Sequence, residues 1–192
     1  MATAKRADIA LVGPTGALEI LKPRVPQRKI PALLASGLLG PRYHHSAGLL
    51  VERDQVERAA ALPDTDITHL HTQVGQVFVT RQTCRTPVTG DPTRQWMGVD
   101  VFAPLPEQLA ATEAWYTIGA QTRAAMRARI HHNGFIPLVS TVSGLVGLCR
   151  DIIEVPTEPG LVRFTTRPAG TWSDLVTNHW LPTRQGGPWT WT

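Results

Sequence analysis

Apolar side chains recur at helical spacing in three segments near the start of the chain, residues 15–21, 26–36 and 54–62. In each segment they fall mostly three or four positions apart, so a helix would bury one face. The positions that carry this pattern are Ala17, Leu18, Leu21, Ile30, Leu33, Leu34, Val56, Ala59, Ala60 and Leu62. The first two segments lie close together, and they predict a helix-turn-helix that is followed by a third helix.

Residues at the ends of these segments fit the same order. Thr15 and Asp54 have side chains that cap helix N-termini, and Gly37 is a residue that ends helices. Between the second and third segments, the polar loop 40–48 leads into the apolar strand Leu49–Val51. We expect this loop and strand to form a β-wing.

Beyond residue 63 the pattern mixes strands with helix. The segments 76–82 and 96–104 favour strands, and residues 106–132 favour a long helix that is interrupted or kinked near Gly119. The segment 63–91 is therefore either a linker or the start of a second domain.

The last third of the chain is rich in β-branched residues and tryptophan. Segments between 135 and 168 favour antiparallel strands, with a hairpin turn at 157–160. Trp189 and Trp191 alternate around Thr190, so they share one face of a terminal strand. The tryptophans of this region either pack in a core or expose a surface for a ligand or a second subunit.

Together these patterns predict an α+β fold with two folded parts. The first part is residues 1–62, and the second is a small α+β domain over residues 92–192 with a long helix and antiparallel strands. We expect the second domain to dimerise, to bind a small-molecule ligand or to recruit another protein.

Positive charge is concentrated in the first part. Residues 1–62 hold nine Lys or Arg and five Asp or Glu, a surplus that equals the +4 net charge of the whole chain. Between Lys22 and His45 there are five basic residues and no acidic one. Such a local field attracts polyanions, although a solvated basic face without a partner is the alternative.

The spacing of certain residues between Gly16 and Leu62 adds a second indication. These residues are Val25, Ile30, Gly37-Leu38-Leu39, Pro41-Arg42, Gly48, Val51 and Val56. Their pattern resembles the winged helix-turn-helix of MerR-type regulators and of the related phage excisionases. In those families the second helix enters the major groove of DNA, and the wing lies along the phosphate backbone.

The resemblance implies a set of DNA-binding residues. It assigns Gln27, Arg28 and Lys29 to the major groove, and it adds Arg24 beside them. It assigns Arg42, Tyr43, His44 and His45 to the phosphates. Arginine pairs with guanine edges and glutamine with adenine, which agrees with these assignments.

Two positions depart from the family pattern. Pro31 lies inside the second helix, so that helix is expected to restart near Pro31 after a tight turn over residues 26–30. Leu49 and Leu50 follow Gly48, where the family has an aromatic residue and an arginine. We expect these leucines in the core or at a protein interface.

Candidate metal ligands are few and poorly spaced. The histidines occur as His44-His45, His69-x-His71 and His131-His132, without a nearby cysteine or carboxylate at ligand spacing. The two cysteines, Cys84 and Cys149, lack a CxxC spacing and are expected as reduced thiols. We therefore expect no metal and no cofactor.

Candidate catalytic residues are equally sparse. Ser143 lacks the GxSxG motif, and Cys149 with His131 or His132 gives only two residue types. A pair of carboxylates, Asp100 with Asp151 or Glu154, is more simply explained by solvated positions on strands. We expect no enzyme.

The sequence thus predicts a protein that binds double-stranded DNA, either sequence-specifically or as an architectural factor, and a transcriptional regulator of the MerR or excisionase type. We expect a homodimer or cooperative oligomer, because one small winged helix buries little surface. No run of about 18 apolar residues exists, so we expect no membrane partner and a cytoplasmic location.

Two alternatives stay open. In one, an enzyme or effector domain at the C-terminus uses the winged helix for targeting. In the other, the winged helix is a protein-interaction module that does not bind DNA, and an acidic partner neutralises the stretch from Lys22 to His45.

Overall fold

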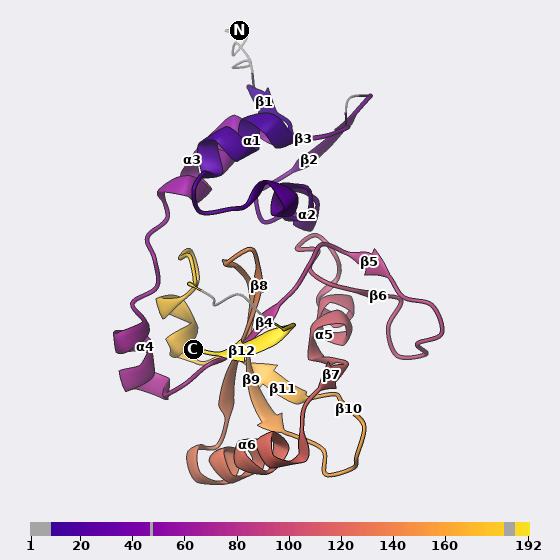
Figure 1. Ribbon diagram of the computed structural model, residues 1–192, viewed down its shortest axis with the longest axis vertical. Coiled ribbons are helices and arrows are strands. Elements are labelled where there is room, and N and C mark those ends of the chain that lie inside the picture. Colours follow the sequence, from indigo (N-terminus) through magenta and orange to yellow (C-terminus); the bar gives the residue numbers. More distant parts are fainter. Residues whose placement is uncertain (1–8, 47, 183–186) are drawn as a thin grey trace, which may run out of the picture.

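The computed structural model describes residues 9–46, 48–182 and 187–192. The first group of elements, which we call the N-terminal unit (residues 9–62), stands at one end of the long axis (Figure 1). Its elements are β1 (Leu11–Val12), α1 (Pro14–Leu21), the 3-10 helix η1 (Gln27–Lys29), α2 (Ile30–Ser36), β2 (Arg42–His45), β3 (Gly48–Glu52) and α3 (Arg53–Ala61). The three strands form an antiparallel sheet in the order β1-β3-β2.

The helices lie close to the expected segments, but the N-caps differ. α1 begins at Pro14 after Gly13, so Thr15 lies in the first turn and does not cap the helix. Proline is well suited to this first position, because its fixed φ matches the helix. Glu52 takes the N-cap of α3 without a side-chain bond, and Asp54 lies in the first turn, where its charge favours the helix dipole.

The second helix of the unit has two parts, in keeping with the expected restart. η1 precedes α2, and Pro31 lies in the first turn of α2, where its missing N–H breaks no hydrogen bond. Gly37 ends α2 in the left-handed conformation, with φ of 80°. The loop expected over residues 40–48 is instead partly strand, since residues 42–45 form β2 and pair with β3.

The remaining residues form what we call the C-terminal unit (residues 63–192). Its elements are α4 (Ile67–Val74), β4 (Phe78–Arg81), β5 (Thr86–Pro87), β6 (Trp96–Met97), α5 (Leu105–Glu113), β7 (Tyr116–Thr117), α6 (Ala120–Asn133), β8 (Ile136–Val142), β9 (Leu145–Glu154), β10 (Leu161–Val162), β11 (Thr165–Pro168), η2 (Thr171–Leu175) and β12 (Trp189–Trp191). The chain as a whole is therefore an α+β fold, as expected.

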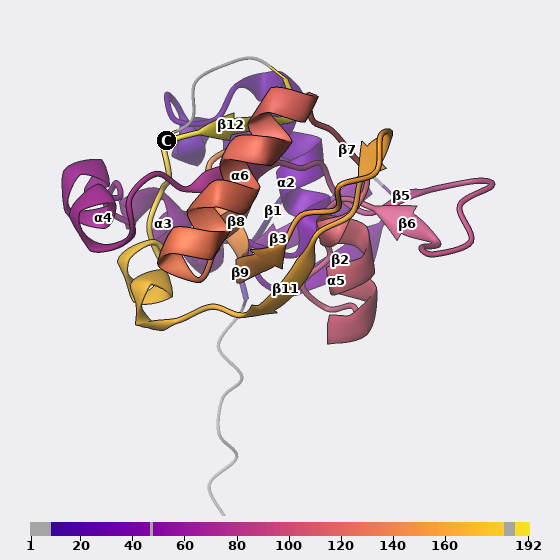
Figure 2. The same cartoon turned by 90° about the horizontal axis from the view of Figure 1, so that it is seen from below.

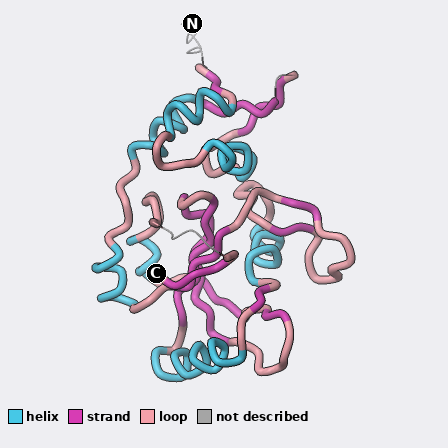
Figure 3. Tube along the Cα trace, viewed as in Figure 1, coloured by secondary structure: helices cyan, strands magenta, loops and turns pink. Residues whose placement is uncertain are grey.

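A five-stranded sheet in the order β11-β9-β8-β4-β12 organises the C-terminal unit (Figure 3). The pairing is mixed, because β4 and β8 run parallel while the other neighbours are antiparallel. β4 is an interior strand, so the segment 63–91 contributes directly to this sheet.

Helices cover both faces of the sheet (Figure 2). α6 packs on one face through Met126 and Ile130, against side chains that include Phe78, Leu138 and Ile152. On the other face, α4 and η2 pack Leu70 and Trp172 against apolar residues of β4 and β8. Trp189 stacks on Phe78 and Trp191 meets the same ring edge to face, with ring centroids 5.2 Å away in each case, so both pack against the core.

The helix expected over residues 106–132, with an interruption or kink near Gly119, is two helices, and Gly119 is the N-cap of the second. α5 and α6 are separate, and the extended strand β7 lies between them and pairs with β10. Tyr116 and Ile118 of this connection are buried with Phe78 and Phe164, which an extended backbone permits and a continuous helix would not. Burial in the core thus outweighs helix propensity here.

Two predictions about strands are also wrong in part. The strand expected over residues 96–104 is reduced to β6, because Val99 and Asp100 turn inward toward the N-terminal unit. The turn at 157–160 does not join a simple hairpin. β9 and β11 do pair, but β10 lies between them in the chain and pairs with β7 instead.

One apolar core joins the two units. The cluster of the N-terminal unit, built on buried residues such as Leu21, Leu33 and Val51, also contains Val99, Val142, Leu145 and Trp180. Trp180 is 4% exposed, and its indole Nε1 donates to the Ala59 carbonyl at 2.8 Å. The N-terminal unit therefore packs against the C-terminal unit through a shared core.

Replacing Gly37 with alanine tests this packing. A Cβ at Gly37 would lie 2.7 Å from the Phe102 ring and 2.8 Å from Val101, and the backbone is left-handed there. Gly134 is a matched control, because it ends α6 with φ of 82° and a Cβ there meets nothing within 4 Å. We expect Gly134→Ala to lower the unfolding free energy by about 1–2 kcal/mol from backbone strain alone, and Gly37→Ala to lower it more. Equal losses in urea titrations would contradict the packing.

The buried Tyr116 hydroxyl predicts alkaline destabilisation. Burial raises its pKa from 10.0 to about 12. Above about pH 10 the unfolded chain therefore releases a proton that the folded chain keeps, so stability falls as pH rises toward 12. We expect Tyr116→Phe to flatten this fall between about pH 9 and pH 11 in urea unfolding. Parallel pH profiles for the two proteins would show that Tyr116 is not responsible.

Candidate nucleic-acid interface

The 3-10 helix η1 presents three consecutive polar side chains at the surface. Gln27, Arg28 and Lys29 are all exposed, whereas Val25 and Ile30 on either side are buried at 1% exposure each. The buried residues anchor the turn, and the three side chains between them project into solvent.

Three cations at η1 and just before it lack carboxylate partners in the described part of the chain. Within the described residues, no ion pair involves Lys22, Arg28 or Lys29. The sequence contains no Asp or Glu between Glu19 and Glu52. The exposed turn therefore carries an uncompensated positive field.

The helix α2 contributes little polar surface of its own. After Lys29 its exposed residue is Pro31, and Ala32 and Ala35 are half-buried. Its one hydroxyl belongs to Ser36, which is fully buried and donates to the Leu33 carbonyl at 2.7 Å. Any hydrogen bond from a side chain of this helical segment to a base edge must therefore come from η1.

The β2–β3 hairpin projects away from the helices of the N-terminal unit (Figure 1). His44 and His45 are exposed on β2, and the expected turn residue Ala47 lies outside the described residues. Tyr43 donates its hydroxyl to Glu52 Oε1 at 2.7 Å, and this hydrogen bond raises the pKa of the phenol. The hairpin thus offers two imidazoles toward solvent.

Arg42 does not face solvent as expected. Its guanidinium donates to the Ala35 carbonyl at 2.6 Å and to Asp100 Oδ1 at 3.0 Å, and it lies over the Phe102 ring at 5.0 Å. Asp100 is 6% exposed and also faces Arg85 at 3.8 Å. Arg42, which was expected to contact phosphates, therefore forms an internal ion pair between the two units.

Arg24 is similarly engaged. It forms an ion pair with Asp64, and its guanidinium lies 5.6 Å from the centroid of Trp180. Asp64 and Trp180 both belong to the C-terminal unit. Of the eight residues assigned to DNA, Arg24 and Arg42 are ion-paired at the junction of the units, although Arg24 is itself exposed, and Tyr43 is half-buried. The other five are exposed: Gln27, Arg28, Lys29, His44 and His45.

Of the three carboxylates expected at solvated strand positions, Asp100 and Asp151 are buried, whereas Glu154 is exposed at the end of β9. Asp100 lies at the junction, whereas Asp151 is 3% exposed and accepts hydrogen bonds from Trp172 at 2.8 Å and from Arg167 at 3.2 Å. The pairing of Asp100 with Arg42 could not be predicted from the chain, because the two residues lie 58 positions apart. The two aspartates hold separate parts of the fold and form no pair with each other among the described contacts.

The described residues give little support for a metal site or for a nucleophilic cysteine or serine. The described residues contain no group of three or more side chains that could hold a metal ion. Burial raises the pKa of the Cys149 thiol to about 12, which disfavours the thiolate that a nucleophile requires. The Ser143 hydroxyl is buried and lacks a hydrogen-bond partner within the described chain.

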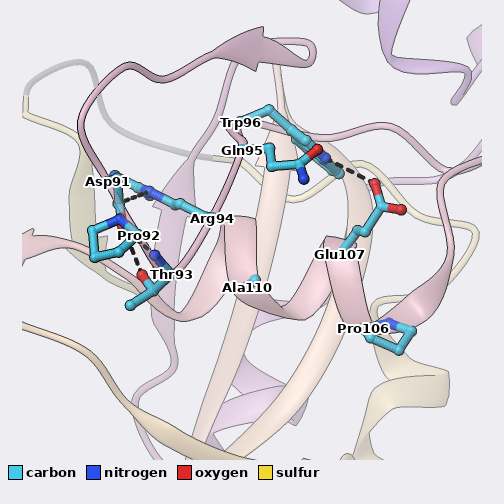
Figure 4. Close-up of a pocket in the computed structure, with 9 residues that line it drawn as sticks. All are labelled: Asp91, Pro92, Thr93, Arg94, Gln95, Trp96, Pro106, Glu107 and Ala110. Carbon is cyan, nitrogen blue, oxygen red and sulfur yellow. Dashed lines mark hydrogen bonds and ion pairs between the residues drawn. The ribbon is translucent and has the colours of Figure 1, made fainter.

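A cavity of about 340 Å³ beside α5 is lined by two carboxylates that are already hydrogen-bonded (Figure 4). Asp91 accepts hydrogen bonds from Thr93, Arg94 and Trp115, and the Thr93 hydroxyl contributes most to lowering the pKa of Asp91. Glu107 accepts from the Trp96 indole at 3.1 Å. The carboxylates of Asp91 and Glu107 therefore hold the loop over residues 91–96 in place.

No helix in the described part of the chain is both long and apolar enough to span a membrane. No protein-family model, curated protein or solved structure matches the chain.

The Arg42–Asp100 pair is expected to stabilise the docking of the two units. A double-mutant cycle with Arg42→Met and Asp100→Asn should give a coupling energy of about 1–3 kcal/mol in urea unfolding, since the carboxylate is buried. The exposed pair Arg53 and Glu57, 3.4 Å apart, is the control, for which about 0.3–0.5 kcal/mol is expected. Similar couplings for both pairs would mean that Asp100 does not hold the junction.

Proposed function

We propose that the chain binds double-stranded DNA through η1 and the β2–β3 hairpin, as an architectural factor or transcriptional regulator. The observation that carries this proposal is the exposed turn of Gln27, Arg28 and Lys29, whose cations have no carboxylate partner within the described residues. Clustered exposed cations attract a polyanion, and their binding to DNA phosphates releases the counter-ions condensed on the DNA.

The order of elements supports a winged helix-turn-helix. α1 and α2 are joined by a short connection, a two-stranded hairpin follows, and α3 packs back on α1. In proteins of this class, the start of the second helix lies at the major groove, and the hairpin lies along the backbone. That arrangement would bring η1 to base edges and would bring His44 and His45 to phosphates.

The chemistry of η1 favours limited base recognition. Arg28 can pair with both acceptors of guanine, Gln27 can pair with adenine, and Lys29 can neutralise a phosphate. Beyond η1, α2 offers alanine and proline, which make only apolar contacts. Among DNA-binding proteins, this set is more typical of an architectural factor than of one that reads a long site.

The small size of this surface favours more than one copy on the DNA. Single modules bury a modest area, and pairing or cooperative binding raises the affinity. We therefore include a homodimer or cooperative array in the proposal.

The test is binding to a short mixed-sequence DNA duplex across a salt series, followed by fluorescence anisotropy. Arg28→Ala with Lys29→Ala should weaken binding and reduce the slope of log K against log salt by about 0.9, because the phosphate contact of Lys29 is lost together with the guanine contact of Arg28. Arg53→Ala with Arg58→Ala removes the same charge from α3 of the same unit and should leave the slope nearly unchanged.

Two outcomes would contradict the proposal. The first is an absence of binding by the unaltered protein at low salt. The second is an equal loss for the two double variants, which would mean that only net charge, and not η1, attracts DNA.

A further inference from the structure

A groove lies between α6 and the loop that joins α4 to β4, in the C-terminal unit. Two cavities, of about 650 and 330 Å³, open along it, and both are lined by Gln76 and Arg129. α6 lies at the end of the molecule opposite α1 and α3 (Figures 1 and 2). The groove is therefore separate from the proposed DNA interface.

The Arg129 guanidinium is held in one orientation. Its Nη2 donates to the Val74 carbonyl at 2.9 Å, and the group lies 5.7 Å from the Trp191 ring centroid. The Trp191 ring is itself fixed against Phe78. A Cβ at Gly75 would lie 3.0 Å from Nη2, so the glycine leaves room for this close approach.

No carboxylate compensates this guanidinium. The other residues lining the two cavities are amides, one hydroxyl and apolar groups: Gln73, Val74, Gly75, Gln76, Gln121, Thr122, Ala125, Met126, Asn133, Phe135 and Trp191. Within the described chain Arg129 forms no ion pair, whereas Arg94 and Arg167 each face an aspartate. Desolvation lowers the pKa of Arg129, as expected for a half-buried cation without a counter-charge.

We propose that this groove binds a small molecule that carries a carboxylate or a phosphate group. The oxyanion would pair with the free N–H groups of Arg129, since a guanidinium fork matches both groups in two-point hydrogen bonds. The amides of Gln73, Gln76, Gln121 and Asn133 would bind neutral polar groups of the same ligand. The cavities have the size of small-molecule sites, and the proposal does not rest on DNA binding.

The experiment is an NMR titration of the full chain with inorganic phosphate and, separately, with succinate, at constant ionic strength maintained with chloride. The readout is the side-chain N–H resonances of Arg129, Gln76 and Gln121. We expect saturable shifts of these resonances with at least one anion. Binding of phosphate alone indicates a phosphate ester as the ligand class, and binding of succinate alone indicates a carboxylic acid.

Two variants identify the binding group. Arg129→Gln should abolish the saturable shifts of Gln76 and Gln121, whereas Arg163→Gln, at an exposed arginine outside the groove, should preserve them. Gln121→Glu places a negative charge in the groove and should weaken binding about fivefold. Ala124→Glu adds the same charge to α6 at an exposed position that lines neither cavity, and it should weaken binding less.

The proposal fails if neither anion produces saturable shifts. It also fails if Arg129→Gln, shown by circular dichroism to be folded, binds as the unaltered protein does. If that variant is unfolded, the comparison of Gln121→Glu with Ala124→Glu decides, and equal weakening overturns the proposal.

Discussion

The buried carboxylate of Asp100 fixes how the two units of this chain sit together. It lies at 6% exposure between Arg42 of the N-terminal unit and Arg85 of the C-terminal unit, and it also accepts from the Phe102 amide. A buried charge is tolerable only when it is paired and hydrogen-bonded. The two units can therefore separate only if Asp100 loses a partner and Trp180 leaves the shared core.

This junction decides which cations are left for a polyanion. Arg24 and Arg42 are two of the five basic residues between Lys22 and His45, and both are engaged by aspartates of the C-terminal unit. The turn η1 remains exposed, and the buried side chains of Val25 and Ile30 on either side hold it against the core. The docking of the units thus narrows the candidate DNA surface to the start of the second helix and the hairpin.

Local pattern predicted much of the N-terminal unit. The spacing of apolar residues located α1, α2 and α3 to within a few positions, and Gly37 ends α2 where a left-handed residue was expected. The α+β class was also correct. Pattern indicated the interruption near Gly119 but not the strand β7 within it, because Tyr116 and Ile118 are buried against Phe78 and Phe164, which lie far away in the chain. The ion pair of Arg42 with Asp100 could not be predicted either, because its two residues also lie far apart in the chain.

The two candidate sites, η1 and the groove at Arg129, also differ in how well they could be predicted from the sequence. The cations of η1 could be recognised from sequence, because the stretch from Lys22 to His45 holds five basic residues and no acidic one. Arg129 gave no signal, since its significance comes from the absence of a carboxylate in three separate segments that meet only in the fold. Sequence reasoning finds clustered charge more readily than charge left unpaired by tertiary structure.

The most direct test of the account is a map of backbone amide shifts when the isotopically labelled full chain is titrated with a short DNA duplex. The account predicts saturable shifts concentrated in residues 22–31 and 42–50, with the α6 groove unaffected. Shifts confined to the C-terminal unit, or spread evenly over all exposed arginines, would contradict it.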